Sequence, residues 1–313
     1  MASLFNFADP LMIALKAVTS ISGNAVTDED IKKQRAGMEL AGRLAAPSDG
    51  ILIRPFTIGE MSCEEVTPEF AYNPKYAILY AHGGGYTCGG ISYARILAAK
   101  LANATGFTVF SFAYRLCPEN KFPAQFEDIS AMYEEILEMG YKPENLLFSG
   151  DSAGGNLVLC FAQQLHKTGG TMPKAMLLFS PWTDLTATQK SYEFNKDKDP
   201  TITREYVEGI RDIYVLDGED PGDPKYSPLF GDFTGFPPTF IMVGQNELLY
   251  NDSEKLYENI EAAGGVSKLD VEEGGWHVYQ QVPLPMANRA MKRLSRFVTE
   301  TIYKCNKPEQ ADI

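Results

Sequence analysis

The chain has 313 residues, of which 44% are hydrophobic and 22% charged, so it can bury one large core. Its formal net charge of −13 at pH 7 repels phosphate backbones and argues against nucleic acid as a partner. No apolar run approaches the roughly 20 residues that cross a bilayer. We therefore expect no stable membrane insertion and a cytoplasmic location.

Short runs rich in Val, Ile, Phe and Tyr alternate with helical patterns along the chain. Strands are expected at Tyr76–Ala81, Phe107–Ala113, Asn145–Gly150, Ala175–Ser180, Pro238–Val243 and Ser267–Val271. Helices are expected at Gln125–Gly140, Ala153–Lys167, Arg204–Leu216 and Asp252–Gly264, the last with Asn251 or Asp252 as its N-cap. This alternation predicts an α/β fold built on a parallel sheet.

Two regions interrupt the alternation and are candidates for a cap. We predict that residues 1–45 form the N-terminal part of the cap and residues 185–235 a cap insertion. Residues 46–184 and 236–313 are then the two parts of the α/β core. The prolines and glycines of residues 217–230 argue against regular structure there.

The five cysteines include no CxxC pair and lack the spacing of metal ligands. They are Cys63, Cys88, Cys117, Cys160 and Cys305. An odd number of isolated thiols is typical of a reducing compartment, so we expect free cysteines and no metal site.

A strand pattern passes into a helix pattern through Gly150-Asp-Ser-Ala-Gly154, a G-x-S-x-G sequence. This motif needs a strained strand-to-helix turn that exposes the serine, and the flanking patterns provide one. A helix that begins near Ala153 also points N–H groups toward the serine oxygen. The context favours Ser152 as a nucleophile over the alternative of an ordinary turn.

A second loop follows the first expected strand and reads His82-Gly-Gly-Gly-Tyr86. Adjacent glycines expose backbone N–H groups, which can stabilise a tetrahedral oxyanion. A flexible turn or part of a phosphate cradle is the alternative, although no Lys-Ser/Thr pair follows as phosphate binding would require.

The chain has only three histidines, which limits the choice of general base. His82 lies in the glycine loop and is better placed to orient the backbone than to move protons. His166 falls near a helix end and is expected to be solvated or to interact with the helix dipole. His277 follows the last expected strand, at the sheet edge where α/β folds concentrate ligands, and is therefore the candidate base.

The segment Gly244–Asp252, directly after the strand that ends at Val243, offers two carboxylates between Ser152 and His277. A triad acid holds the imidazole tautomer and stabilises its charged form. Glu247 comes first after the strand and is preferred. Asp252 remains the alternative acid, with helix capping as its competing role.

These motifs resemble the hormone-sensitive lipase family of α/β-hydrolases, the bacterial family IV esterases. The resemblance spans most of residues 50–290 and rests on four motifs in the right order: His82-Gly-Gly-Gly85; Tyr114-Arg-Leu-Cys-Pro-Glu119 with Phe122-Pro-Ala124 and Asp128; Gly150-Asp-Ser-Ala-Gly-Gly-Asn156; and Ser180-Pro-Trp-Thr-Asp184. It implies a mostly parallel eight-stranded sheet flanked by helices, with a helical cap.

The resemblance also implies a site. Ser152 would be the nucleophile, His277 the base, and the backbone N–H groups of Gly84, Gly85 and Ala153 the oxyanion hole, with His82 and Gly83 supporting the loop. The family usually has aspartate where this chain has Glu247. Its members act on short-chain esters through an acyl-enzyme and need no metal or organic cofactor.

Other functions remain open on the same scaffold. An amide or formamide hydrolase would use the same triad, and a small-ligand receptor would use the pocket without catalysis. The resemblance further suggests a homodimer, which the last strand could form as a sheet edge unless Lys268 and Asp270 block pairing. Aromatic side chains that would line an acyl pocket or simply pack in the core are Phe5, Phe7, Tyr206, Tyr214 and Phe230.

Overall fold

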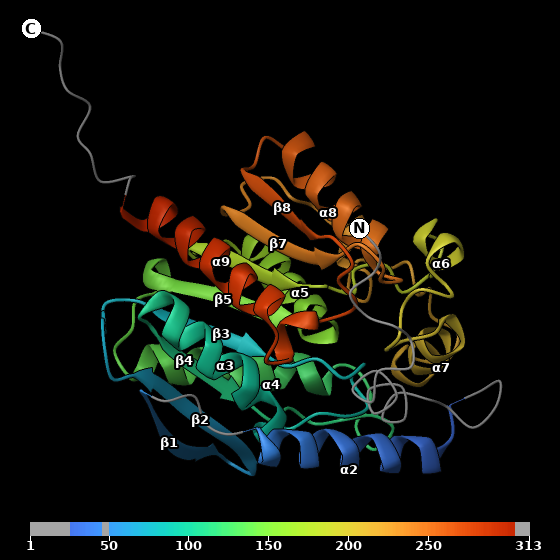
Figure 1. Cartoon of the computed structure of the whole chain (residues 1–313), viewed down its shortest axis with the longest axis horizontal. Helices are drawn as coiled ribbons and strands as arrows, with labels where there is room; N and C mark the ends of the chain where they lie inside the picture. The colour runs from blue at the N-terminus through green and yellow to red at the C-terminus, as the bar shows by residue number, and fades with distance from the viewer. Residues whose placement is uncertain (1–25, 46–49, 304–313) are drawn as a thin grey trace, which may run out of the picture.

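The computed structural model describes residues 26–45 and 50–303, and a single sheet of eight strands lies at its centre (Figure 1). The strand order is β1-β2-β4-β3-β5-β6-β7-β8. The strands are β1 (Ile51–Ile58), β2 (Met61–Pro68), β3 (Ala77–Ala81), β4 (Thr108–Phe112), β5 (Leu146–Asp151), β6 (Ala175–Phe179), β7 (Thr239–Gly244) and β8 (Ser267–Glu272). All pairs from β4 to β8 are parallel, and β1 and β2 add an antiparallel hairpin. The expected mostly parallel eight-stranded sheet is confirmed.

Helices cover both faces of this sheet. They are α2 (Asp28–Leu44), α3 (Ile91–Thr105), α4 (Ala124–Glu138), α5 (Ala153–Lys167), α6 (Ser191–Phe194), α7 (Arg204–Tyr214), α8 (Tyr250–Ala262) and α9 (Pro285–Tyr303), with short 3-10 helices η1 (Pro143–Asn145), η2 (Pro228–Phe230) and η3 (Tyr279–Gln281). α3 and α9 pack on one face, and α4, α5 and α8 on the other.

Alternate residues of the central strands supply two separate cores. Leu79 and Phe148 point into the core beneath α4 and α5, whereas Ile78 and Leu147 point into the core beneath α3 and α9. Successive side chains of a strand face opposite sides of the sheet, so a strand buried on both faces must be apolar throughout. This explains why the central strands read as unbroken apolar runs in the sequence.

The hairpin β1–β2 was not among the strands expected from the pattern. β1 is half exposed and contains Pro55, and β2 carries Glu64 and Glu65, so neither strand is a continuous apolar run. The Glu64 carboxylate is nevertheless buried, because Arg95 of α3 forms an ion pair with it. Because contacts distant in sequence stabilise this edge hairpin, its own sequence shows only a weak strand pattern.

Two expectations about local structure are wrong. α8 begins at Tyr250, so neither Asn251 nor Asp252 is its N-cap. The Asp252 carboxylate instead accepts hydrogen bonds from the backbone N–H groups of Thr183 and Asp184. In residues 217–230 a short 3-10 helix does form, at Pro228–Phe230, because proline is tolerated in a first helical turn.

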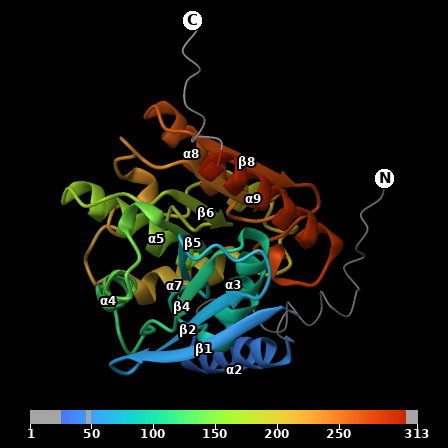
Figure 2. The same ribbon diagram turned by 90° about the vertical axis from the view of Figure 1, so that its left-hand side faces the viewer.

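Helices from distant parts of the sequence meet beyond the carboxyl ends of the parallel strands. Figure 1 shows α6 and α7 together on one side, with α2 running toward them, and Figure 2 shows α2 beside β1. Arg35 of α2 ties this helix to the core, since its guanidinium donates to the carbonyl oxygens of Thr87 and Cys117 and pairs with Glu119. These segments therefore stand over the sheet edge that carries the candidate site.

Candidate active site

Ser152 occupies the turn between β5 and α5. β5 is buried along its whole length, and the helix begins at the next residue, Ala153. The serine has φ 53° and ψ −121°, a conformation that costs energy for a residue with a side chain. Glycine is required beside it, because a Cβ on Gly154 would lie 2.1 Å from the Ala81 carbonyl oxygen. The motif thus holds the serine on a sharp, closely packed turn.

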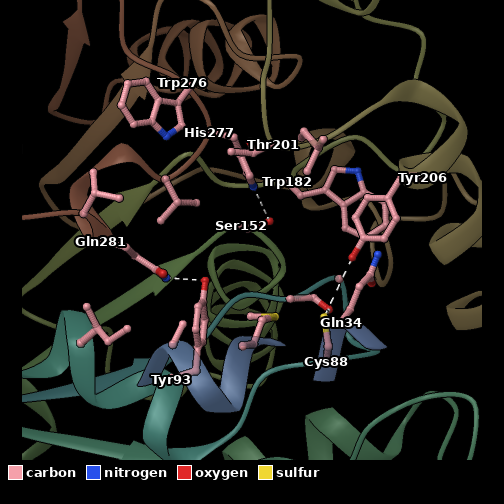
Figure 3. A pocket seen from close by; sticks show the side chains of 18 of the residues that line it. Gln34, Cys88, Tyr93, Ser152, Trp182, Thr201, Tyr206, Trp276, His277 and Gln281 are labelled. Atoms are coloured by element: carbon pink, nitrogen blue, oxygen red, sulfur yellow. Dashed lines mark hydrogen bonds between the residues drawn. The ribbon is translucent and has the colours of Figure 1, made fainter. Parts of the chain in front are cut away.

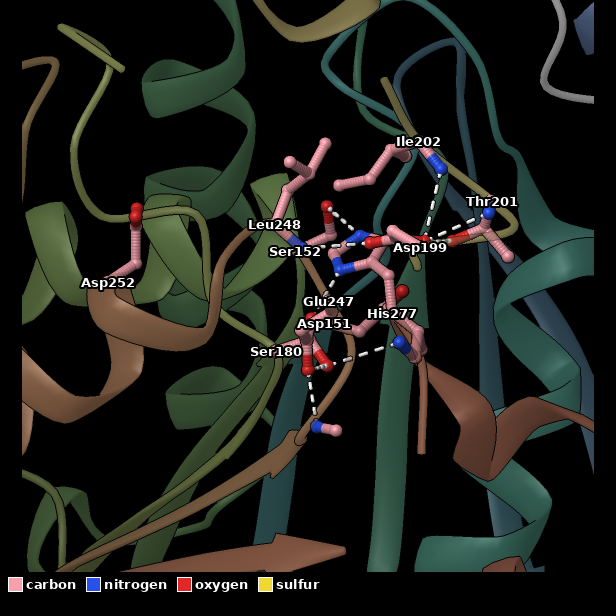
Figure 4. A network of polar contacts seen from close by, with 12 residues as sticks. Asp151, Ser152, Ser180, Asp199, Thr201, Ile202, Glu247, Leu248, Asp252 and His277 are labelled. Atoms are coloured by element: carbon pink, nitrogen blue, oxygen red, sulfur yellow. Dashed lines mark hydrogen bonds and ion pairs between the residues drawn. The ribbon is translucent and has the colours of Figure 1, made fainter. Parts of the chain in front are cut away.

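His277 joins this serine to a carboxylate (Figure 4). Its Nε2 lies 2.9 Å from Ser152 Oγ, and its Nδ1 lies 2.8 Å from Glu247 Oε2. A carboxylate can only accept here, so Nδ1–H donates to Glu247 and Nε2 is left to accept from the serine hydroxyl. Only 9% of the histidine side chain is exposed. The geometry is that of a base held between a nucleophile and an orienting acid.

Glu247 is fully buried in the turn between β7 and α8. Its Oε1 accepts from the Ser180 hydroxyl at 2.9 Å and from the Gly244 backbone N–H. The same Ser180 oxygen accepts from the Val278 backbone N–H at 3.1 Å, directly after His277. Ser180 therefore connects the acid to the loop that carries the histidine.

The charges of the site favour a protonated imidazole during reaction. Burial lowers the pKa of His277, but the hydrogen bond and charge of Glu247 more than offset this, with smaller contributions from Asp199 and Asp151, so the pKa is raised. Burial raises the pKa of Glu247, opposed by its bond to His277. An imidazolium that forms between nearby carboxylates is stabilised where it forms.

Asp252, the alternative acid, points away from this group (Figure 4). Its carboxylate is buried and accepts hydrogen bonds from the backbone N–H groups of Thr183 and Asp184, at 3.0 and 2.9 Å, rather than from His277. Burial, together with the charge of Asp184, raises the pKa of Asp252 well above its usual range. Of the two carboxylates weighed from sequence, the structure brings Glu247 to the histidine and leaves Asp252 in a structural position.

The glycine loop lies beside Ser152. Gly84 has φ +112° and Gly85 φ +60°, values that side chains rarely adopt, and both residues line the same pocket as the serine. A Cβ on Gly84 would lie 2.3 Å from the Cys88 carbonyl oxygen. Ala153, the first residue of α5, follows the serine directly in the chain. The loop beside the serine therefore has a backbone conformation that favours glycine at both positions.

His82 and Gly83 hold this loop from beneath. The Gly83 N–H donates to the Asp151 carboxylate at 2.9 Å, and His82 Nδ1 lies 2.7 Å from the Gly83 carbonyl oxygen. The imidazole stacks on Tyr114, whose hydroxyl donates to the His82 carbonyl oxygen. Burial lowers the pKa of His82 to about 4, so it is neutral at pH 7. His82 is thus a buried support of the loop.

A pocket of about 400 Å³ opens over Ser152 and His277 (Figure 3). Its walls are mostly apolar. α2 contributes Met38 and Ala41, and residues 185–235 contribute Ile202, Tyr206 and Ile210. We refer to α2 and residues 185–235 as the pocket-wall segments. Of the aromatic side chains expected at a pocket, Tyr206 lines it, Tyr214 and Phe230 do not, and Phe5 and Phe7 lie outside the described residues.

A polar network closes one side of the pocket. Gln281 of η3 donates to Tyr93 and to the Asp151 carboxylate, whose pKa burial raises to about 6 against the opposing hydrogen bonds of Tyr80 and Gly83. The ammonium of Lys100 donates to the carbonyl oxygens of Gln280, Gln281 and Val282 at the end of η3. The segment just after His277 is therefore held by α3.

The sequence analysis assigned no role in the site to four of these supporting residues: Ser180, Asp151, Asp199 and Lys100. Ser180 and Asp151 lie within motifs that carry the family resemblance, so a signal was present although no role was assigned. Lys100 falls in a helix pattern and Asp199 in a polar, irregular segment, where neither position differs locally from a solvent-exposed charge. Only the tertiary structure brings them to the site.

No group of three or more His, Cys, Asp or Glu side chains in residues 26–45 and 50–303 is arranged to hold a metal ion. Cys63, Cys88, Cys117 and Cys160 are free and buried, and Cys305 lies outside the described residues. Within that same part of the chain, no helix combines the length and hydropathy needed to cross a bilayer.

Comparison with known proteins agrees with the fold and the motifs. Residues 78–281 match the family described as the alpha/beta hydrolase fold. An esterase of Acinetobacter venetianus is 32% identical over 259 residues, covering 82% of this chain and 85% of the relative. An acetyl-hydrolase of Streptomyces hygroscopicus is 34% identical over 265 residues, covering 83% and 85%.

Solved structures give the same result. A crystal structure of an esterase from the bacterial hormone-sensitive lipase family superposes with a TM-score of 0.84 at 32% identity, covering 93% of this chain and 96% of that one. A hormone-sensitive lipase from a metagenome library gives a TM-score of 0.84 at 29% identity, covering 93% and 97%. The chain belongs to the hormone-sensitive lipase family of the α/β-hydrolase fold, and it is a carboxylic ester hydrolase.

Proposed function

We propose that Ser152, His277 and Glu247 form the catalytic triad of a serine carboxylesterase. The observation that carries this proposal is the chain of two hydrogen bonds, 2.9 Å from Ser152 Oγ to His277 Nε2 and 2.8 Å from Nδ1 to Glu247. A serine becomes nucleophilic when a neighbouring base accepts its proton, and the acid stabilises the resulting imidazolium.

In the acylation half, Ser152 Oγ attacks the ester carbonyl carbon while its proton passes to His277 Nε2. The carbonyl oxygen becomes an oxyanion, for which the backbone N–H groups of Gly84, Gly85 and Ala153 are the proposed donors. Such donors reduce the barrier by about 3 kcal/mol each. The ester C–O bond then breaks, and His277 returns the proton to the departing alcohol.

In the deacylation half, water attacks the acyl-enzyme. His277 takes a proton from the water, a second oxyanion forms, and the bond to Ser152 Oγ breaks as the proton returns to the serine. The carboxylic acid leaves and the triad is restored. No step uses a metal or an organic cofactor.

We propose esters of short acyl chains as the substrates, with the pocket-wall segments as a cap. A pocket of about 400 Å³ with apolar walls suits a small ester. The similarity to an acetyl-hydrolase supports the same size class. The four buried free thiols support a cytoplasmic location.

A homodimer through β8 is part of the same proposal. β8 lies at one edge of the sheet and leaves a row of backbone groups open to pairing, as the order of strands requires. Sedimentation velocity of the wild type and of a Leu269→Pro variant tests it: the proline removes a backbone donor, so a β8-paired dimer would dissociate, whereas a monomer in both cases contradicts the proposal.

Hydrolysis of p-nitrophenyl acetate, butyrate and decanoate by wild type, Ser152→Ala and His277→Ala tests the proposed function. We expect rapid turnover of the shorter esters by wild type and losses on the order of 10⁴-fold or more in both variants, with circular dichroism unchanged. Mass spectrometry should detect an acyl group on Ser152. A folded wild type that releases no nitrophenol contradicts the proposal and favours a receptor, and turnover of matched anilides but not esters favours an amidase.

A further inference from the structure

A third carboxylate, Asp199, lies buried close to the triad without belonging to it. It falls in the segment between α6 and α7, and only 6% of its surface is exposed. Its Oδ1 accepts from the Thr201 backbone N–H at 2.9 Å, the Thr201 hydroxyl at 2.7 Å and the Ile202 N–H at 3.3 Å. Both Thr201 and Ile202 line the pocket. One oxygen of Asp199 therefore organises part of the pocket wall.

The other oxygen reaches the turn that carries the triad acid. Asp199 Oδ2 accepts from the Leu248 backbone N–H at 3.0 Å, one residue after Glu247 (Figure 4). Asn195, from the same segment, donates to the carbonyl oxygen of Glu247 at 2.9 Å and to that of Gln245 at 3.0 Å. The turn that holds Glu247 is thus bonded from outside the sheet, by one of the pocket-wall segments.

A purely local role would use only one of these oxygens. An aspartate that accepts from the N–H two residues ahead forms an ordinary Asx turn, and that alone explains the bonds to Thr201. It does not explain the bond to Leu248, which is 49 residues away in sequence. A carboxylate shared by the pocket wall and the acid turn joins two parts of the site.

The charge of Asp199 also bears on the histidine. Among the ion pairs of the described residues, none involves Asp199, and the four hydrogen bonds that its carboxylate accepts come from neutral donors. The carboxylates that face His277 are Glu247 after β7, Asp199 before α7 and Asp151 at the end of β5. Asp151 also serves the glycine loop, which leaves Asp199 as the second carboxylate associated with the acid turn.

We propose that Asp199 is a positioning residue for ester hydrolysis, which ties the Glu247 turn to the pocket wall at Thr201 and Ile202. The inference rests on the proposed triad. It predicts that Asp199 contributes chiefly to kcat, because it acts through the orientation of the acid and the stability of the imidazolium rather than by touching the ester.

The test compares Asp199→Asn with Asp197→Asn. Asp197 lies two residues earlier and is exposed, so it undergoes the same chemical change away from the site. We expect Asp199→Asn to lower kcat for p-nitrophenyl butyrate by about 10- to 100-fold with a smaller change in KM, and to move the acid limb of the kcat/KM profile to lower pH. Asp197→Asn should match wild type. A D199N enzyme with the kcat and pH profile of D197N overturns the proposal.

A double variant separates positioning from general loss of structure. If Asp199 acts through Glu247, its replacement should cost less than about threefold in a Glu247→Gln background, where the acid is already absent. An equal loss in both backgrounds, with circular dichroism unchanged, overturns the proposal.

A further variant decides the case in which D199N does not fold. Thr201→Val keeps the shape of the side chain and removes one donor to Asp199, so we expect kcat to fall about fivefold. A change confined to KM, or no change, overturns the proposal. Each experiment includes the wild type and Ser152→Ala. If the wild type shows no activity that depends on Ser152, the proposed function fails. If it does, a negative result with the Asp199 or Thr201 variants counts only against the role of Asp199.

Discussion

The sheet edge and the pocket-wall segments contribute to the same site in different ways. The sheet edge supplies Ser152, Glu247 and His277. They lie in the loops after β5, β7 and β8, and each of these strands is held in place by parallel pairing with a neighbour. The pocket-wall segments supply apolar surface from α2 and α7, and polar side chains such as Arg35 and Asp199 bond these segments to loops beyond the strand ends.

This contrast separates rate from selectivity. Groups fixed by the sheet can be held within the narrow tolerance that proton transfer needs, whereas the apolar side chains of the helices above the edge can vary without moving the proposed triad. We therefore expect changes at the edge to reduce turnover of every ester and changes in the apolar wall side chains to alter which ester is preferred, whereas Asp199 should act on turnover because it is bonded to the Glu247 turn.

Among variants that leave Ser152 and His277 in place, the largest effect is expected for Glu247→Gln. The amide keeps the shape of the side chain but favours the wrong imidazole tautomer, so kcat should fall by about 10³- to 10⁴-fold. Steady-state kinetics with p-nitrophenyl butyrate measures the loss, and Asp252→Asn is the matched control because it changes a carboxylate that the structure places away from His277. Equal losses in the two variants would contradict the assignment of Glu247.

The same variant should change the pH dependence. His277 must be neutral to accept the serine proton, and Glu247 raises its pKa, so activity falls as pH falls through that raised value. Removing the charge lowers the pKa of His277, and the acid limb of kcat/KM should move to lower pH in Glu247→Gln. If the acid limb of the kcat/KM profile does not move, a group other than His277 controls it.

Gly84→Ala is expected to have the next largest effect. The added Cβ would meet the Cys88 carbonyl oxygen at 2.3 Å, so the glycine loop must move away from Ser152, with a loss in kcat on the order of 100-fold. Gly59→Ala is the control, since it also has positive φ but would meet nothing within 4 Å. A folded Gly84→Ala enzyme with wild-type kcat would argue against a role for this loop in oxyanion binding.

A smaller, selective effect is expected in the pocket wall. Ile210 lines the pocket, and Ile210→Ala enlarges it, so the ratio of kcat/KM for decanoate over acetate should rise about tenfold. Turnover of acetate should stay near wild type. Val266→Ala, at an exposed position, controls for loss of a branched side chain. A uniform fall for both esters would contradict the separation of rate from selectivity.

The smallest effect concerns stability. Burial raises the pKa of Asp252 in the folded state, so the folded protein binds a proton more readily than the unfolded chain. Stability contributed by this group is present at low pH and declines as pH rises above the ordinary aspartate value. Thermal unfolding of Asp252→Asn should therefore show a smaller loss of Tm between pH 5 and pH 8 than wild type. An identical loss would mean that Asp252 does not titrate in this range.

Sequence reasoning worked where the determinants are local. The turn at Ser152 needs glycines, a buried strand and a helix start within about ten residues, and all of these can be read in the sequence. The central strands are apolar on both faces and stand out for the same reason. The position of His277 followed from the small number of histidines and the expected sheet edge.

Sequence reasoning failed for residues whose bonding partners are distant in the sequence. The sequence predicts Asp252 as a possible helix cap, but its carboxylate accepts hydrogen bonds from the backbone N–H groups of Thr183 and Asp184, which are remote in sequence. Asp199 looks like any polar loop residue until its bond to Leu248 is seen. The hairpin β1–β2 depends on pairing with β4 and on the ion pair with Arg95 rather than on its own pattern.

The order of the strands also has a consequence for synthesis of the protein. Ser152 precedes His277 by 125 residues, which takes about 6 to 25 s at ordinary rates of translation. During that interval β5 can pair with β3, but β7 and β8 are only being synthesised and the Lys100 contacts of η3 are still missing. A nascent chain therefore carries its serine without a base, and it becomes an esterase only when the last strand and the loop after it have joined the sheet.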